Sequence, residues 1–311
     1  MMINQLSLPK VSVVLCSFNG AKHIEEQLQS VMQQTYSNLE FIFSDDASTD
    51  DTVAIMENLS KADERVKIFR QQTNIGYNGN FVSACQKAAG EFIAICDQDD
   101  IWHPEKISRM MAGWVKDVPL MYCNSIRFSG DEIPKDPDDN PLYRRFEGKD
   151  LRKLSVFNTI SGHALIFKRR FLNSILPVPE KLMYDWWAGA VASCNGGVGY
   201  LHDILVYQRV HGNNVSVGKG FTHLDSRYKK DFNLMVLNHQ KAFRNIKGIS
   251  IEQQSFFSAI VPLWETAMKR KFYLPLFLFL IRNRKSVFWY KRKKMPLISH
   301  IKHSYLLTKN P

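Results

Sequence analysis

Residues 11–20 read Val-Ser-Val-Val-Leu-Cys-Ser-Phe-Asn-Gly, and an alternation of strand and helix signals begins with them. Its first part, Val11–Cys16, is a largely apolar run, as expected of a strand that is buried on both faces of a sheet. Ile24, Leu28 and Val31 follow at the i, i+4, i+7 spacing of one helix face. A buried strand followed by an amphipathic helix predicts the first strand–helix unit of an α/β domain.

The same order recurs through the first hundred residues. Further strands are expected at Phe41–Phe43, Val66–Phe69 and Phe92–Cys96, with helices between them. Repeated strand–helix units predict an α/β fold with a Rossmann-like, mainly parallel sheet flanked by helices, and ligands of such sheets bind beyond the carboxyl ends of the strands. The acidic segments Asp45-Asp46 and Asp97–Asp100 both fall at such ends.

The pattern changes beyond residue 118. Met121-Tyr122 is expected to continue the sheet, and Gly130–Pro141 is expected to form a surface loop because it is rich in Asp, Pro and Gly. A helix is expected after Asp185, and a strand over Val198–Val206. After residue 220 the periodicity is helical, which predicts a C-terminal helical extension.

Composition excludes several classes of protein. The chain has 311 residues, 45% apolar and 23% charged, so it is neither disordered nor collagen-like nor of low complexity. Its net charge of +11 lies in residues 262–311, which hold twelve Lys/Arg and a single acid, Glu265. The remainder has 29 basic and 29 acidic residues. A neutral globule with a cationic tail indicates contact with nucleic acid or with an anionic membrane.

Three features bear on the compartment. The N-terminal sequence MMINQLSLPK has no apolar signal core, so we expect the protein not to be secreted. The longest apolar run, Phe272–Ile281, has ten residues, whereas a bilayer-spanning helix needs about 20. Five cysteines without CxxC spacing are expected to be mostly buried thiols in a reducing compartment. They are Cys16, Cys85, Cys96, Cys123 and Cys194.

Two acidic segments are candidates for binding chemistry. Adjacent carboxylates in Asp97-Gln98-Asp99-Asp100 repel one another unless a cation neutralises them, and Mg²⁺ bound by carboxylates commonly also binds substrate phosphates. The alternative is a helix-capping loop before Pro104. In Asp45-Asp46-Ala47-Ser48 a carboxylate could accept a hydrogen bond from a nucleobase, with Phe18 stacking on the base. The alternatives there are a plain N-cap and a core phenylalanine.

Two later segments could carry catalysis. Asp185 precedes two tryptophans, whose apolar rings favour a general base and could hold a sugar ring. The alternative is a helix N-cap beside core tryptophans. The segment 209–214, Arg-Val-His-Gly-Asn-Asn, could contact a phosphate or a metal, although a lone histidine such as His211 is often structural.

Absent motifs narrow the choice of enzyme. The sequence has no GxxxxGK[ST] phosphate loop, no GxGxxG after a strand, no GxSxG and no HExxH. Phosphate-loop, dinucleotide-binding, serine-hydrolase and zinc-protease sites are therefore not expected.

Taken together and in this order, the motifs resemble those of the inverting family 2 glycosyltransferases of the GT-A fold. The likeness covers roughly residues 9–215 and is greatest to rhamnosyltransferase-like bacterial members that build surface polysaccharides such as lipopolysaccharide or capsule. The motifs that carry it are VSVVLCSFNG (11–20), SDDASTDDT (44–52), NIGYNGNF (74–81), DQDDIW (97–102), YDWW (184–187) and HGNN (211–214).

The resemblance implies residue roles. Asp46 would hold a pyrimidine base, Phe18 would stack on it and Asp97 would contact the ribose. Asp99 would bind Mg²⁺ or Mn²⁺ at the diphosphate, and His211 would reach the metal or the diphosphate. The full set of donor-binding positions is Cys16, Phe18, Asn19, Asp46, Asn74, Gly76, Asp97, Gln98 and Arg209.

On the acceptor side, Asp185 would deprotonate the acceptor hydroxyl. The acceptor-binding positions are Trp102, His163, Trp186 and Trp187. Two departures matter. Cys16 stands where the family often has Thr, and the Gln-x-x-Arg-Trp element of processive synthases is missing, which disfavours a chain polymerase.

The expected function is a metal-dependent, inverting transfer of a sugar from dTDP-rhamnose or a UDP-hexose to a lipid-linked or surface-polysaccharide hydroxyl. The alternatives are a sugar-nucleotide nucleotidyltransferase and an inactive membrane-bound scaffold. The expected ranges are a nucleotide-sugar half (1–115), an acceptor and catalytic half (116–220) and a membrane-associating region (221–311).

The tail from Phe272 alternates apolar-aromatic and basic blocks, which suits an anionic membrane interface. We therefore expect a cytoplasmic protein that is peripheral on the inner face of the cell membrane and binds no nucleic acid. The alternative is a helix packed on the catalytic domain with its basic side in solvent.

Overall fold

The computed structural model describes residues 8–61, 63–130, 133, 143–211, 226–292 and 295–309. Most of the expected loop Gly130–Pro141, and Gly212–Asn214 of the HGNN motif, lie outside these residues. The chain forms two compact units. The first comprises Met1–Asp139, Ser161–Leu176 and Gly199–His211, and the second comprises Asn140–Ile160, Pro177–Val198 and Gly212–Pro311.

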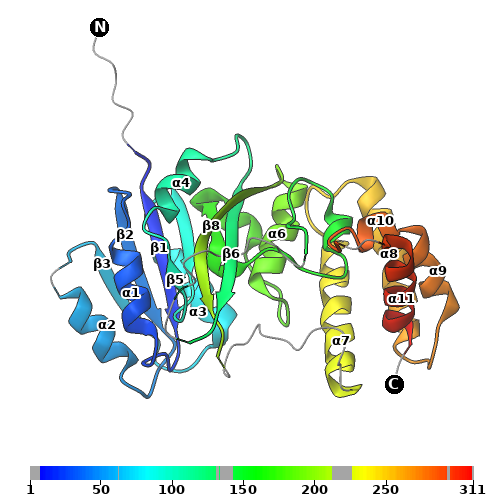
Figure 1. The fold of residues 1–311 in the computed structure, drawn as a ribbon, viewed down its shortest axis with the longest axis horizontal. Coiled ribbons are helices and arrows are strands. Elements are labelled where there is room, and N and C mark those ends of the chain that lie inside the picture. The colour runs from blue at the N-terminus through cyan, green and yellow to red at the C-terminus, as the bar shows by residue number, and fades with distance from the viewer. Residues whose placement is uncertain are drawn as a thin grey trace, which may run out of the picture. The chain divides into compact units, whose positions relative to one another are not determined.

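The first unit is built on one eight-stranded sheet of order β3-β2-β1-β4-β7-β6-β8-β5 (Figure 1). Its first half is parallel: β1 pairs with β2 and β4, and β2 pairs with β3. The register sets Ser17 beside Asp45, so the carboxyl ends of β1 and β2 meet at one edge. The bounds are β1 Val11–Ser17, β2 Leu39–Asp45, β3 Val66–Arg70 and β4 Phe92–Cys96.

The second half of the sheet contains antiparallel pairs. Strand β7 (Leu165–Lys168) runs against β4 and β6 (Leu120–Phe128), and the short β5 (Ile101–Trp102) runs against β8 (Val198–Arg209). The expected α/β fold class is confirmed, with parallel pairing through the N-terminal strands and antiparallel pairing beyond them.

The helices of this unit follow from local sequence. In α1 (Ile24–Met32) the predicted stripe Ile24, Leu28 and Val31 is fully buried, because these side chains share one face and pack into the core. Helix α3 begins at Gly76, whose φ of +77° suits a residue without Cβ. The other segments are α2 Thr52–Ser60, α4 Lys106–Ala112, η2 Gly162–Ala164, η3 Arg169–Phe171 and α5 Leu172–Ile175.

The second unit is helical, which confirms the predicted C-terminal helices. Its aromatic core includes Phe243, Phe257 and Trp264, each at most 1% exposed. None of the helices within the described ranges has both the length and the apolar character that a bilayer crossing needs. The segments are η1 Leu151–Leu154, α6 Tyr184–Cys194, α7 Ser226–Phe243, α8 Ile251–Ala267, α9 Leu274–Arg282, α10 Arg284–Val287 and α11 Pro296–Thr308.

The expectation that the cysteines are mostly buried thiols is confirmed. All five are free thiols, of which Cys85, Cys96 and Cys123 are buried while Cys16 and Cys194 are partly exposed. Burial raises the pKa of the Cys85 and Cys96 thiols well above the ordinary range, so both are uncharged core side chains.

Candidate active site

The loop after β1 presents an aromatic ring to solvent. Phe18 is 44% exposed, although it directly follows a buried strand. The next residue, Asn19, has a φ of +48°, a left-handed conformation that asparagine tolerates well. Its backbone N–H donates to Ser48 Oγ (2.8 Å), and its Oδ1 accepts from Thr49 N (2.9 Å). The loop is thus fixed while the Phe18 ring stays available for stacking.

A second contact ties this loop to the acidic segment after β4. The Phe18 N–H donates to Gln98 Oε1 (2.9 Å), and Gln98 Nε2 donates to the Phe18 carbonyl (3.2 Å). Gly20 lies against the same amide, because a Cβ on Gly20 would lie 2.3 Å from Gln98 Oε1. Gln98 therefore positions Phe18 in this structure, and glycine at position 20 leaves room for it.

Asp45, the last residue of β2, and Asp46, which follows it, are both buried, at 0% and 3% exposure, but have different partners. The Asp45 carboxylate has a structural role, because it accepts hydrogen bonds from Ser17 Oγ (3.0 Å) and from the N–H of Ser48 (2.8 Å). Asp46 accepts from the N–H of Ile75 through Oδ1 (2.8 Å), which joins the β2 and β3 loops. Of this pair, Asp46 is the one we retain as a candidate ligand for a base.

Two further expected donor positions lie close by in the fold. Cys16 lies one residue before the end of β1, where burial, then the negative charges of Asp97 and Asp46, raise the pKa of its thiol. Asn74 is exposed, and its Oδ1 accepts from the N–H of Gly76 (3.0 Å) at the start of α3. Both positions lie near the carboxyl edge of the parallel strands.

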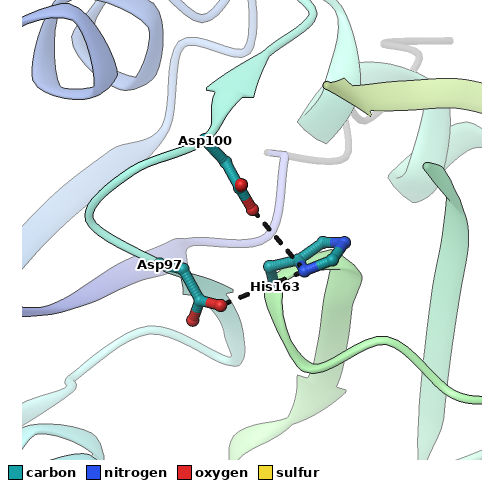
Figure 2. Close-up of side chains that lie close together, drawn as sticks. All are labelled: Asp97, Asp100 and His163. Atoms are coloured by element: carbon teal, nitrogen blue, oxygen red, sulfur yellow. Dashed lines mark ion pairs between the residues drawn. The ribbon is translucent and has the colours of Figure 1, made fainter. Parts of the chain in front are cut away.

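The acidic segment after β4 forms a cluster with a histidine. His163 Nδ1 lies 3.5 Å from Asp100 Oδ2 and 4.0 Å from Asp97 Oδ2 (Figure 2). One potential ligand atom from each residue lies within 4.8 Å of the others. Asp100 is 2% exposed, and its Oδ2 makes no hydrogen bond within the described part of the chain. Burial, followed by repulsion from Asp97 and Asp99, raises the pKa of Asp100 well above its ordinary range.

These observations test whether the residues fit a divalent cation. A buried carboxylate oxygen without a hydrogen-bond donor, beside further carboxylates and an imidazole, is an environment that a cation would stabilise. The donor set of oxygens with imidazole nitrogen suits Mn²⁺ or Mg²⁺. The residues present therefore fit the expected metal, and His163, expected in acceptor binding, joins this cluster instead.

Asp99, from the same acidic segment, pairs with another histidine, His211. His211 Nε2 lies 2.8 Å from Asp99 Oδ2, and the His211 ring stacks on His23 with centroids 5.0 Å apart. The resemblance implies that Asp99 binds the metal and that His211 reaches the metal or the diphosphate, and the structure brings these two side chains together from distant segments. Desolvation, then the positive charge of Arg209, lowers the pKa of His23.

Sequence reasoning missed Lys106. Its side chain is fully buried at the start of α4, where Nζ donates to the His163 carbonyl (3.0 Å) and lies 3.2 Å from the centroid of the Trp102 ring. Burial lowers the pKa of Lys106 to about 8. This cation interacts with the charges of Asp100 and Asp97, and its hydrogen bond holds the η2 backbone that carries His163. Nothing in the local sequence distinguishes it from a surface lysine.

Two expected binding residues are structural here. Trp102 is 2% exposed beneath Lys106, so it offers no ring face to an acceptor, and we correct that assignment. Arg209 is 5% exposed, forms an ion pair with Glu26, donates to the Gly130 carbonyl (3.0 Å) and packs over Phe128. Its guanidinium is thus engaged by protein groups, although its backbone N–H donates to Asp100 Oδ1 (3.2 Å) and helps position that carboxylate.

The second unit carries the expected base. Asp185 lies in the first turn of α6 and is partly exposed. Its Oδ2 accepts from Asn158 Nδ2 (3.2 Å), and its Oδ1 accepts from the Trp186 N–H (2.7 Å). Asn158 is anchored in turn, because its Oδ1 accepts from the Ile160 N–H (2.9 Å). The carboxylate therefore has a fixed orientation on a rigid helix.

The two tryptophans after Asp185 differ. Trp186 is 1% exposed, donates from Nε1 to the Leu154 carbonyl (2.8 Å) and stacks on His239 with centroids 4.1 Å apart. It is a core residue, so its expected role in acceptor binding is corrected. Trp187 is partly exposed and stays a candidate for acceptor contact.

Comparison with protein families gives the class. Residues 12–175 match the family model described as glycosyl transferase family 2. This match covers more than half of the chain. The chain belongs to glycosyl transferase family 2.

Individual relatives support the same class. An uncharacterized glycosyltransferase of Nostoc sp. is 29% identical over 220 residues, which cover 66% of this chain and 66% of the relative. A GalNAc(5)-diNAcBac-PP-undecaprenol beta-1,3-glucosyltransferase of Campylobacter jejuni is 33% identical over 147 residues, 47% of this chain and 45% of the relative. The matched regions thus cover about two thirds and less than half of these relatives' lengths.

Solved structures show the fold. S. aureus TarS 1-349 in complex with UDP-GlcNAc aligns with a TM-score of 0.61 at 18% identity, over 96% of this chain and 90% of that chain. The mannosyltransferase PcManGT from Pyrobaculum calidifontis in complex with GDP-Man and Mn²⁺ aligns with a TM-score of 0.57 at 16% identity, over 95% and 79%. The architecture of this chain is therefore that of GT-A glycosyltransferases.

Proposed function

We propose that this protein transfers a sugar, with inversion, from a pyrimidine nucleotide-diphosphate sugar to a hydroxyl of a lipid-linked or surface-polysaccharide acceptor. The observation that carries the proposal is one edge of the first unit's sheet. An exposed ring, Phe18, and the carboxylate of Asp46 lie there with the cluster of Asp97, Asp100 and His163 and with the pair of Asp99 and His211. Such an edge offers a ring on which the base can stack and carboxylates that can accept hydrogen bonds from the base and the ribose. It also offers ligands for a cation at the diphosphate of the same donor.

In this proposal the Phe18 ring stacks on the base while Asp46 accepts from a base N–H and Asp97 from the ribose. Asp99 and His211 would hold Mg²⁺ or Mn²⁺, with the cluster of Asp97, Asp100 and His163 beside them. A bound divalent cation supplies electrostatic stabilisation of the negative charge that develops on the leaving diphosphate.

Asp185 acts as the general base. It takes the proton of the acceptor hydroxyl as the bond from that oxygen to the anomeric carbon forms and the bond to the diphosphate breaks. One displacement inverts the anomeric centre and requires no protein nucleophile. The fixed orientation of Asp185 by Asn158 suits a single proton transfer.

The finer identity rests on the resemblance and on the relatives. We propose dTDP-rhamnose as the first donor to test, in line with the rhamnosyltransferase-like motifs, and UDP-hexoses as the second. A lipid-linked acceptor is in line with the undecaprenol-linked glycan that the Campylobacter relative's name specifies. We further propose residues 1–115 as the donor half, 116–220 as the acceptor half, and 221–311 as the region that holds the enzyme on the inner face of the cell membrane.

The test is calorimetric titration of the purified chain with UDP and with dTDP, each with and without Mn²⁺. We expect one nucleotide to bind, with affinity that depends on the metal and that falls in Asp99→Ala. Transfer assays with Asp185→Ala should show lost turnover and retained nucleotide binding. Release of pyrophosphate from a sugar phosphate and a nucleoside triphosphate would instead indicate a nucleotidyltransferase. Binding of neither nucleotide by folded protein would favour the inactive scaffold.

A further inference from the structure

Helix α11 buries a stripe of mainly polar side chains and exposes a stripe of apolar ones, the reverse of an ordinary amphipathic helix. Its buried side carries His300, Ser304 and Thr308 at i, i+4, i+8, together with Leu307. Its exposed side carries apolar residues at the same spacing, with Leu297 at 51%, Ile301 at 43% and Tyr305 at 45% exposure. In a helix surrounded by water the apolar stripe faces the core. The outward stripe of α11 is therefore the kind of surface that an apolar partner would cover.

Helix α9 extends this surface. It exposes Leu274 (53%) and Leu278 (55%) at i, i+4 while it buries Leu276 and Leu280. The ring of Phe272, two residues before α9, has its centroid 6.0 Å from that of Phe277 and 5.9 Å from that of Tyr305. Figure 1 shows α9 in orange and α11 in red, and the two helices contact each other.

We name this surface the α9–α11 face. Eight of the fifteen large apolar side chains that the described part of the chain exposes belong to it, so exposure is concentrated here and not scattered. Its members are Phe272, Leu274, Leu278, Met295, Leu297, Ile298, Ile301 and Tyr305.

Exposed basic residues precede, interrupt and follow these apolar side chains in the sequence. Lys269, Arg270 and Lys271 are exposed immediately before Phe272, and Lys302 and Lys309 are exposed along and after α11. No Asp or Glu occurs in the sequence after Glu265. Glu265 itself forms an ion pair with Lys241 (2.6 Å). The face is thus apolar with cationic neighbours and carries no acidic residue.

We infer that the α9–α11 face docks on an anionic lipid bilayer, with its apolar side chains at the headgroup–acyl boundary and its lysines and arginines at the headgroups. Apolar area and positive charge together are what such a surface binds. A second copy of the face would bring cations against cations, and a nucleic acid would leave the apolar stripe uncovered. The inference deepens the proposed function, which assigns residues 221–311 to the membrane, and it rests on that function for the purpose of docking, namely access to a lipid-linked acceptor.

The experiment is flotation of the full chain with vesicles of phosphatidylcholine alone and of phosphatidylcholine mixed with phosphatidylglycerol. We expect flotation with the mixed vesicles that weakens at high salt. The double variant Leu297→Glu with Ile301→Glu should lower the partition coefficient by at least about tenfold, because two apolar anchors become charges. The triple variant at Lys269, Arg270 and Lys271 to Gln should lose binding to the anionic vesicles preferentially.

Ile251 gives a matched control, because it is 85% exposed in the same unit at the start of α8 and lies outside the face. Ile251→Glu should float as the wild type does, and all variants should keep the wild-type circular dichroism and melting temperature. Flotation of the Leu297→Glu, Ile301→Glu protein at the wild-type level would overturn the inference. So would a wild-type dimer by light scattering that this pair of substitutions dissociates, with no flotation of the wild type.

The readout separates this inference from the proposed function. Flotation needs no catalysis, and nucleotide titration needs no membrane. Protein that floats but binds no nucleotide contradicts the transferase proposal and leaves the docking in place. Protein that binds nucleotide but never floats contradicts the docking, and with it the membrane role proposed for residues 221–311, but leaves the transferase proposal in place.

Discussion

Gln98 and Phe18 exchange two hydrogen bonds: the Phe18 N–H donates to Oε1 (2.9 Å), and Nε2 donates to the Phe18 carbonyl (3.2 Å). The Gln98 amide, in the acidic segment after β4, thereby binds both the N–H and the carbonyl of Phe18 in the loop after β1. The two loops, 80 residues apart in sequence, hold each other. Any ligand that uses both the Phe18 ring and the neighbouring aspartates meets them in a fixed relation.

Replacing Gln98 should therefore weaken nucleotide binding without removing a catalytic group. Gln98→Ala loses both bonds, each worth about 1 kcal/mol, so we expect the affinity for UDP or dTDP to fall by roughly tenfold. Gln98→Glu keeps an acceptor for the Phe18 N–H and should lose less at low salt. Calorimetric titration measures both. Gly20→Ala should behave like Gln98→Ala, because its methyl group displaces the same amide.

The Phe18 ring itself should contribute by stacking. Because the side chain is 44% exposed, Phe18→Ala should leave the melting temperature nearly unchanged. Its nucleotide affinity should fall by about tenfold or more, since stacking on an aromatic ring is worth about 1–3 kcal/mol per base. Val115 is 46% exposed in the same unit, so Val115→Ala is the control. Equal affinities for Phe18→Ala and Val115→Ala would remove Phe18 from the site.

Asn158 should act on Asp185 as a positioning residue. Asn158→Ala removes the donor to Asp185 Oδ2, and we expect kcat to fall by roughly tenfold, the loss expected when a carboxylate loses one hydrogen bond. The KM for the donor should change little, because the expected donor-binding side chains lie in the other unit. Asp185→Asn should abolish turnover altogether. A rise in donor KM with unchanged kcat in Asn158→Ala would contradict the positioning role.

Lys106 should oppose cation binding at the acidic cluster. It is a buried positive charge beside Asp100 and Asp97, so Lys106→Met should tighten Mn²⁺ binding by roughly tenfold, as expected from removing one like charge at an intermediate dielectric. The same change should lower the stability of the metal-free protein, because the His163 carbonyl loses its donor. Lys106→Arg keeps the charge and is the control. Manganese titration followed by electron paramagnetic resonance distinguishes the two variants.

Local patterns predicted the elements of the fold well. The apolar run of β1 and the stripe Ile24, Leu28, Val31 of α1 need only their own neighbours in the sequence to be recognised. The acidic edge was predictable for the same reason, because Asp45-Asp46 lies at the end of β2 and Asp97–Asp100 directly follows β4.

The burial and the hydrogen-bond partners of side chains that pack against distant segments could not be predicted in this way. Asp45 and Asp46 are adjacent and have the same neighbours in sequence. Only the pairing of Ser17 with Asp45 shows that the Asp45 carboxylate is the one held by hydrogen bonds within the fold. Trp102 and Trp186 were both expected to bind the acceptor, yet Lys106 covers the ring of one and His239 the ring of the other. Asn158 lies 27 residues from Asp185 and carries no motif.

His239 provides the last prediction, because it links a buried stack to the helix that carries Asp185. Its Nε2 accepts from the Met183 N–H (3.1 Å), directly before α6, its Nδ1 lies 2.8 Å from the Met235 carbonyl, and its ring stacks on Trp186. Burial lowers its pKa from 6.5 to about 4, so the folded protein holds a neutral ring.

The unfolded chain takes up a proton at an ordinary histidine pKa, so between 6.5 and about 4 it binds more protons than the folded chain. Stability from this group is therefore present above pH 6.5 and is lost as the pH falls toward 4, by up to about 3 kcal/mol. His239→Phe keeps a ring but loses the acceptor, so near neutral pH it should be less stable by about 1–2 kcal/mol.

That deficit should shrink or reverse near pH 4, because phenylalanine has no proton to take up on unfolding. Urea denaturation of both proteins across this range measures the difference in slope. His202 is exposed, so His202→Phe should leave the slope unchanged. A constant difference between wild type and His239→Phe at every pH would mean that His239 is not the neutral ring that holds the start of α6.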